Sequence, residues 1–81
     1  MFKNKANDSN NISGIRIAEL RKACKPKMSQ KSLADKMQIE GIDLDKNAIQ
    51  RIEAGKRFVT DIEIVAFARV FKVTTDYLLG L

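Results

Sequence analysis

The sequence contains no histidine and no tryptophan, and it has only one cysteine and one proline. A single cysteine excludes a disulfide framework, and without histidine a zinc site is not expected, so we predict neither metal nor cofactor. No apolar run is long enough to span a membrane. The opening segment MFKNKANDSNN lacks the apolar stretch of a secretion signal. These absences predict a protein of the reducing cytosol with no membrane partner.

Groups suited to catalysis are also scarce. Besides the missing histidine, the sequence shows no nucleophile with an adjacent base and no glycine-rich loop of the kind that holds a phosphate. We interpret the carboxylates Asp61, Glu63 and Asp76 as helix caps and first-turn charges instead of an acid–base pair. The sequence therefore does not predict an enzyme.

The 81 residues suffice for one small domain, and they carry a formal net charge of +5. The positive charge is concentrated in the first two thirds of the chain, whereas residues 58–81 have two cations and three carboxylates. This uneven distribution favours one face for a polyanion and another for the core or a partner. We predict a flexible, asparagine-rich tail over 1–11 and a folded domain over 12–81.

Apolar spacing and helix signals predict an all-α fold. Ser29, Asp45 and Thr60 are candidate N-caps, and TDIE at 60–63 matches a capping box. The expected helices span Ser13 to about Cys24, 29–37, 45–54, Thr60 to about Phe71, and 74–80. The connection QIEGIDLD between the second and third helices is expected to return Ile39, Ile42 and Leu44 to the core.

The third expected helix, within DKNAIQRIEAGKR, has two sharply different faces. Ile49 and Ile52 lie three residues apart on one side, so burial of these two turns the opposite side outward. Amides can pair with an adenine edge, and Arg or Lys can donate to guanine. A solvated helix face is the alternative interpretation. The outward residues, as candidate contacts to DNA bases, are Lys46, Asn47, Gln50 and Arg51.

Two further pairs are candidates for contacts to DNA phosphates. Lys56 and Arg57 follow the third helix, where they would position the protein on the backbone or only complement the negative end of the helix dipole. Gln30 and Lys31 open the second helix, where free N–H groups favour an anion, although Lys31 also suits simple solubility.

Three segments in order, MSQKSLADKM, KNAIQRIEAGKR and VTTDYLL, resemble the Cro/repressor-type (XRE-like) helix-turn-helix family. The resemblance implies a five-helix, lambda-repressor-like DNA-binding domain whose third helix (45–54) enters the major groove of double-stranded DNA. It also implies a homodimer and an ion pair between Arg21 and Glu53. The chain departs from the family by an extended link between the second and third helices, where a tight turn is usual.

We therefore predict a sequence-specific transcriptional regulator, a repressor that acts by occupying its operator as a dimer. The alternative is an antitoxin or other protein-binding module, with a toxin or anti-repressor as its partner. A candidate dimer face combines C-terminal residues with a stripe on the fourth helix. An equally good interpretation is that these residues are buried in the core of the domain. That face comprises Tyr77, Leu79, Leu81, Ile62, Ala66 and Val70.

Overall fold

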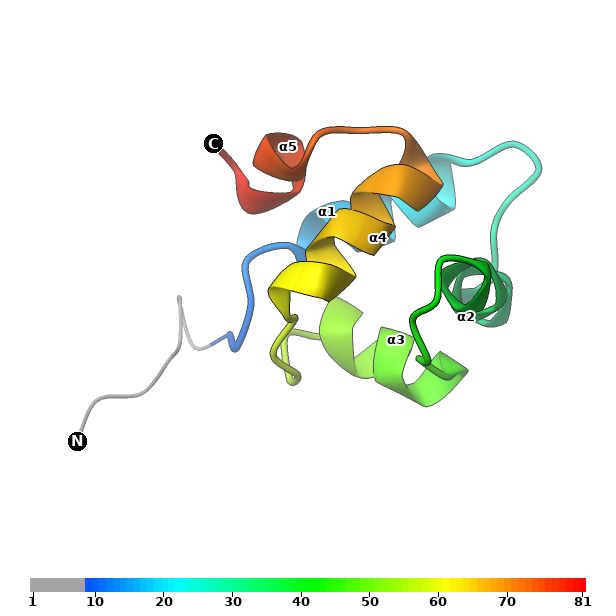
Figure 1. Cartoon of the computed structure of the whole chain (residues 1–81), viewed down its shortest axis with the longest axis horizontal. Helices are drawn as coiled ribbons and strands as arrows, with labels where there is room; N and C mark the ends of the chain where they lie inside the picture. Colours follow the sequence, from blue (N-terminus) through cyan, green and yellow to red (C-terminus); the bar gives the residue numbers. More distant parts are fainter. Residues whose placement is uncertain (1–8) are drawn as a thin grey trace.

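Five α-helices follow one another in the computed structural model, which describes residues 9–81, and this described part contains no β-strand. The predicted all-α, five-helix class is confirmed. Figure 1 shows α4 across the middle of the molecule, with α5 above it and α2 and α3 below it. The helices are α1 (Gly14–Ala23), α2 (Gln30–Ile39), α3 (Lys46–Glu53), α4 (Asp61–Phe71) and α5 (Thr75–Leu79).

The helices begin where local side chains satisfy free backbone N–H groups of the first turn. Ser29 accepts a hydrogen bond of 3.0 Å and Asp45 one of 2.7 Å, each from the N–H of the third residue of its helix. Thr60 and Glu63 form the reciprocal capping box that TDIE predicts. These starts are local consequences of the sequence, which is why they could be expected in advance.

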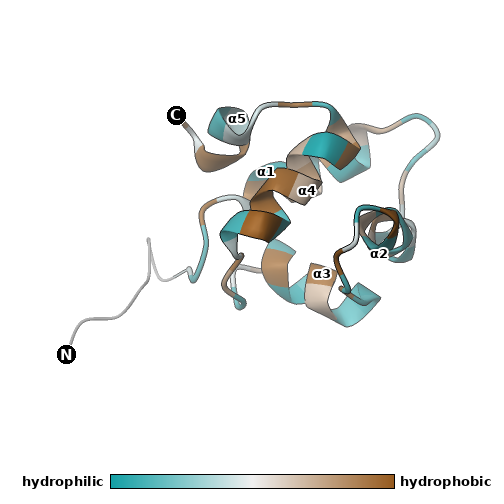
Figure 2. Cartoon of the chain, viewed as in Figure 1, coloured by the Kyte–Doolittle hydropathy of each residue, from teal (hydrophilic) through white to brown (hydrophobic). Residues whose placement is uncertain are grey.

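The core forms around Phe67 of α4, whose side chain is completely buried. Figure 2 shows that α4 consists mostly of hydrophobic residues, as its central position requires. Burying a large apolar side chain contributes about 1.5–3 kcal/mol, so a few such residues hold the helices together. Each of the other helices supplies fully buried side chains to this core, namely Ile17, Leu33, Met37, Ile49, Ile52 and Leu78.

The link between α2 and α3 departs in part from the expectation. Leu44 is buried and Ile42 is half-buried, but Ile39 is 84% exposed, so its predicted return to the core is wrong. The helix continues past Met37 to Ile39, and two further residues rotate the side chain by about 200°, onto the opposite face of α2. Gly41 then ends the helix with a positive φ of 84°.

The residues just before α1 are held against the end of α3. The backbone N–H of Asn10 donates to the Gly55 carbonyl at 2.8 Å, and the Asn11 amide donates to the carbonyls of Ile52 at 3.0 Å and Arg57 at 2.8 Å. Residues 9–11 were expected in the flexible tail, whereas the structure attaches them to the folded domain. The remainder of that predicted tail, 1–8, lies outside the described residues.

The packing of α2 against α3 determines how α3 is held on the domain. Figure 1 views α2 nearly along its axis while α3 runs across the view, so the two helices are steeply inclined to each other. They pack directly against each other, and α3 also packs on α1. None of the described helices is long and apolar enough to cross a membrane.

Candidate nucleic-acid interface

The helix α3 has one fully apolar side and one fully polar side. Ile49 and Ile52 are both 0% exposed, so the inward orientation expected of them is found. Ala48, beside them, is partly buried against the same core. With this side fixed by packing, the remaining side of α3 has to face outward.

The four residues predicted to contact bases all lie on this outward side and are exposed. Among the described residues, their side chains make no hydrogen bond with another part of the protein. The face thus offers paired amide donors and acceptors next to cationic donors, the groups that can recognise base edges. Its members are Lys46, Asn47, Gln50 and Arg51.

A half-buried polar cluster fixes the C-terminal end of α3. Arg21 of α1 forms a two-pronged ion pair with Glu53, with N–O distances of 2.6 and 2.9 Å, and also donates to the Met28 carbonyl at 3.0 Å. The hydrogen bond to Glu53 raises the pKa of Arg21, outweighing the opposite effect of burial. This is the pair that the family resemblance implies, and it ties α3 to α1.

Gln30 joins the same cluster instead of extending into solvent. Its amide N–H donates to the Glu53 carboxylate at 3.0 Å, so the first residue of α2 is attached to the last residue of α3. A contact from Gln30 to a phosphate was predicted, but its side chain is already engaged inside the protein. Sequence patterns do not indicate this contact, because the two residues are 23 positions apart.

Arg57 has a similar internal role. Its guanidinium donates to both carboxylate oxygens of Glu63, at 3.0 and 3.2 Å, and to the Phe58 carbonyl at 2.9 Å. Glu63 is only 7% exposed and also caps Thr60. The sequence predicts the capping role of Glu63 but does not indicate its ion pair with Arg57. The capping box was the available signal, since it orients the carboxylate back toward the preceding link.

These contacts alter the ionisation of Glu63. Burial by itself would raise the pKa of this carboxyl group. The hydrogen bonds from Arg57 and from the Thr60 backbone, together with the positive charge of Arg57, outweigh burial and leave the pKa below its ordinary value. The charged form of Glu63 therefore stabilises the link between α3 and α4.

Two of the residues predicted to contact phosphates, Lys56 and Lys31, remain accessible. Lys56 is exposed, and its backbone N–H closes the end of α3 by donating to the Arg51 carbonyl at 2.8 Å. The Lys31 side chain on α2 is 75% exposed and pairs with Asp35 at 3.2 Å. Such an exposed pair contributes about 0.3–0.5 kcal/mol, so Lys31 can exchange this partner for a phosphate at little cost.

Residues 17–78, most of the chain, match the protein family described as helix-turn-helix. Comparisons with curated proteins and with solved structures give no match. The family match agrees with the all-helical fold and with the steep inclination of α3 to α2 in Figure 1. The chain is therefore a member of the helix-turn-helix family, which consists of DNA-binding regulators.

Proposed function

We propose that this protein binds a specific sequence of double-stranded DNA by inserting α3 into the major groove. The observation that carries the proposal is the complete burial of Ile49 and Ile52, which leaves an uncommitted polar face on the other side of α3. A major groove about 12 Å wide admits an α-helix, and its base edges present a distinct pattern for every base pair.

The side chains on that face have separable roles in this proposal. Asn47 and Gln50 pair with adenine edges, and Lys46 and Arg51 donate to guanine. Lys31 and Lys56 contact phosphates on either side and set the position of the protein on the duplex. Gln30 and Arg57 contribute less to phosphate binding, because each is held by a carboxylate of the protein. Arg21 and Glu53 do not contact DNA in this proposal; their ion pair orients α3.

The protein acts in this proposal as a repressor. Two copies related by a two-fold axis occupy half-sites about 34–36 Å apart, one turn of DNA, and exclude RNA polymerase by occupancy. The positive charge of the first two thirds of the chain accelerates association with DNA of any sequence, and the base contacts then select the operator.

Selection of bound sequences from a random pool of DNA tests the proposal. We expect enrichment of a two-fold symmetric site whose half-sites are centred about 10–10.5 base pairs apart. A pool without enrichment would contradict sequence-specific binding. A reporter with the selected site across its promoter then tests the direction of regulation: expression is expected to fall when the protein is present, and increased expression would contradict repression.

A further inference from the structure

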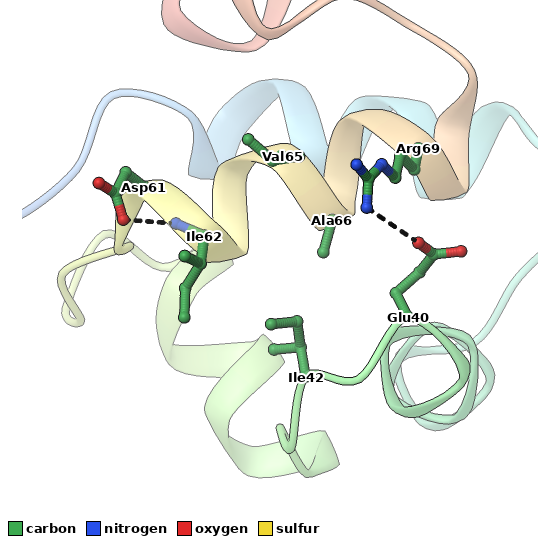
Figure 3. A pocket seen from close by; sticks show the side chains of 7 residues that line it. All are labelled: Glu40, Ile42, Asp61, Ile62, Val65, Ala66 and Arg69. Carbon is green, nitrogen blue, oxygen red and sulfur yellow. Dashed lines mark hydrogen bonds and ion pairs between the residues drawn. The ribbon is translucent and has the colours of Figure 1, made fainter.

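An open apolar groove lies between the outer face of α4 and the link that joins α2 to α3. Figure 3 shows Ile42 of the link and Ile62 of α4 pointing toward each other, with Ala66 directed into the same gap. Ile62 is 65% exposed and Val65, also lining the groove, is 41% exposed. Apolar side chains gathered on an open surface, with polar residues at the margin, are typical of an interaction site.

The margin of the groove has Asp61 at one end, and at the other end it has Arg69 together with its ion-pair partner Glu40. Asp61 lies at the first position of α4 and Arg69 lies two turns later, about 12 Å along the helix axis. Val65 is halfway between them in the sequence. From the N-terminal to the C-terminal end of α4, the surface is therefore first acidic, then apolar and then basic. In an antiparallel copy of the helix this order is reversed.

This order of charges makes the surface complementary to itself. When two such helices pack antiparallel about a two-fold axis, Asp61 of each copy lies near Arg69 of the other, while Ile62 and Val65 of both copies meet in the centre. An isologous interface needs this kind of self-complementarity, in which the same patch serves on both partners. The groove thus fits a second copy of this chain better than it fits a partner of uniform charge.

Arg69 can exchange its ion-pair partner in the same chain for Asp61 of a second copy. Its only ion pair within the described residues is with Glu40, at 3.9 Å, and its side chain is 68% exposed. An exposed pair at that distance contributes at most about 1 kcal/mol and often nothing measurable. Arg69 can therefore reach an aspartate of a second copy without loss of a strong internal contact.

We infer that the groove formed by Ile42, Ile62 and Val65 is the self-association surface of the protein, and that the chain dimerises through antiparallel α4 helices. The inference rests on the dimer of the proposed function and deepens it by naming the surface. The residues that line the groove come from α4 and the α2–α3 region and not from α3. The polar face of α3 consequently remains accessible to DNA in the dimer.

Reversal of the charges at the two ends provides the test. Sedimentation equilibrium on the full chain, without DNA, measures the dimer dissociation constant of the parent, Asp61→Arg and Arg69→Asp. Each single variant places like charges opposite each other at both ends, so dimerisation is expected to weaken by about tenfold or more. In an equimolar mixture of the two variants, opposite charges meet again at both ends, and tight heterodimers are expected.

A second pair of variants tests the apolar centre. Ile62→Asn should weaken dimerisation, whereas Ile15→Asn, at a 71% exposed isoleucine of α1 outside the groove, should leave it unchanged. Circular dichroism and thermal melting of each variant verify that the monomer is folded. Equal effects of the two substitutions would contradict the assignment of the groove.

The inference is overturned if the parent chain remains monomeric at every concentration, or if the mixture dimerises no better than its components. These measurements contain no DNA, so they fail independently of the selection experiment. A monomeric chain that still enriches a DNA sequence would remove this surface and leave DNA recognition intact. A groove that instead captures a different protein, with no self-association, would also overturn it.

Discussion

Individual side chains on α3 differ in what they can distinguish on DNA. Gln50 presents a donor and an acceptor side by side, which match the exposed edge of adenine, and Arg51 can donate twice to guanine. Both are exposed on the same helix, one residue apart. Loss of either side chain should therefore remove discrimination at a base pair, in addition to weakening binding.

Gln50→Ala and Arg51→Ala are each expected to cost about 1–3 kcal/mol at the selected site and to relax preference at one base pair. Binding isotherms on the selected site and on its single-base variants measure both effects. Gln38→Ala is the matched control, because Gln38 is an exposed glutamine near the end of α2. If either α3 variant binds the selected site as tightly as the parent, that base contact is absent.

Glu63 provides a residue-scale prediction about stability. Its pKa is lower in the folded protein than its ordinary value, so below that value the unfolded chain binds more protons than the folded one. The stabilisation is present above about pH 4.3, the ordinary pKa of glutamate, and is lost as the pH falls through the depressed folded value.

We expect Glu63→Gln to reduce the urea midpoint at neutral pH and to make stability less dependent on pH in the acidic range. Urea unfolding at neutral and acidic pH measures this difference against the parent. Asp35→Asn removes an exposed carboxylate of α2 and serves as control, with little expected change. A Glu63→Gln variant with the parent's pH dependence would show that the Arg57 pair does not hold in solution.

At the scale of elements, the ends of α2 and α3 use the same conformation in different surroundings. Gly41 and Gly55 both have a positive φ, 84° and 75° respectively. A side chain added at Gly41 would meet nothing within 4 Å, whereas a Cβ at Gly55 would lie 2.3 Å from the Ser9 hydroxyl. The end of α3 is thus covered by the segment that precedes α1, and the end of α2 is open.

Gly41→Ala is expected to cost about 1–2 kcal/mol, the penalty of the left-handed conformation alone. Gly55→Ala should cost about 0.5–1.5 kcal/mol more, because the added methyl group also displaces the Ser9 hydroxyl from its hydrogen bond to the Asn11 carbonyl. Chemical denaturation of the two variants gives the comparison. Equal losses of stability would mean that residues 9–11 do not pack on the end of α3.

At the scale of the whole molecule, the positive charge is concentrated in the part of the chain that contains α3. The region from Lys46 to Arg57 has four cations and one carboxylate. It contains α3, the helix that we propose enters the major groove. Affinity for DNA should therefore fall steeply with salt, because each phosphate contact releases counterions. Base contacts should be less sensitive to salt than phosphate contacts are.

Lys56→Gln is expected to weaken binding to all DNA sequences alike and to flatten the slope of log K against log salt by about one unit. Titrations over a range of salt concentrations measure that slope. Lys72→Gln, at the end of α4, removes the same charge away from α3 and should leave the slope unchanged. An unchanged slope for Lys56→Gln would remove this lysine from the phosphate contacts.

Much of the fold could be expected from the sequence because its signals act over short distances. The caps at Ser29, Asp45 and Thr60 bond within three residues, and the stripe of Ile49 and Ile52 follows from helical periodicity. These rules locate the helices and the outward face of α3 without knowledge of tertiary contacts. The family resemblance added the partner of Arg21, which periodicity alone does not indicate.

Tertiary structure alone decided which polar groups remain free. Gln30 and Arg57 looked as suitable for phosphate as Lys31 and Lys56 did. Folding brings Gln30 to the carboxylate of Glu53, 23 residues away, and pairs Arg57 with the buried carboxylate of Glu63. The exposure of Ile39 and the attachment of residues 9–11 were also settled only by packing. A helix face or a cap depends on neighbours along the chain, whereas the partner of a charge depends on which distant segments share the core.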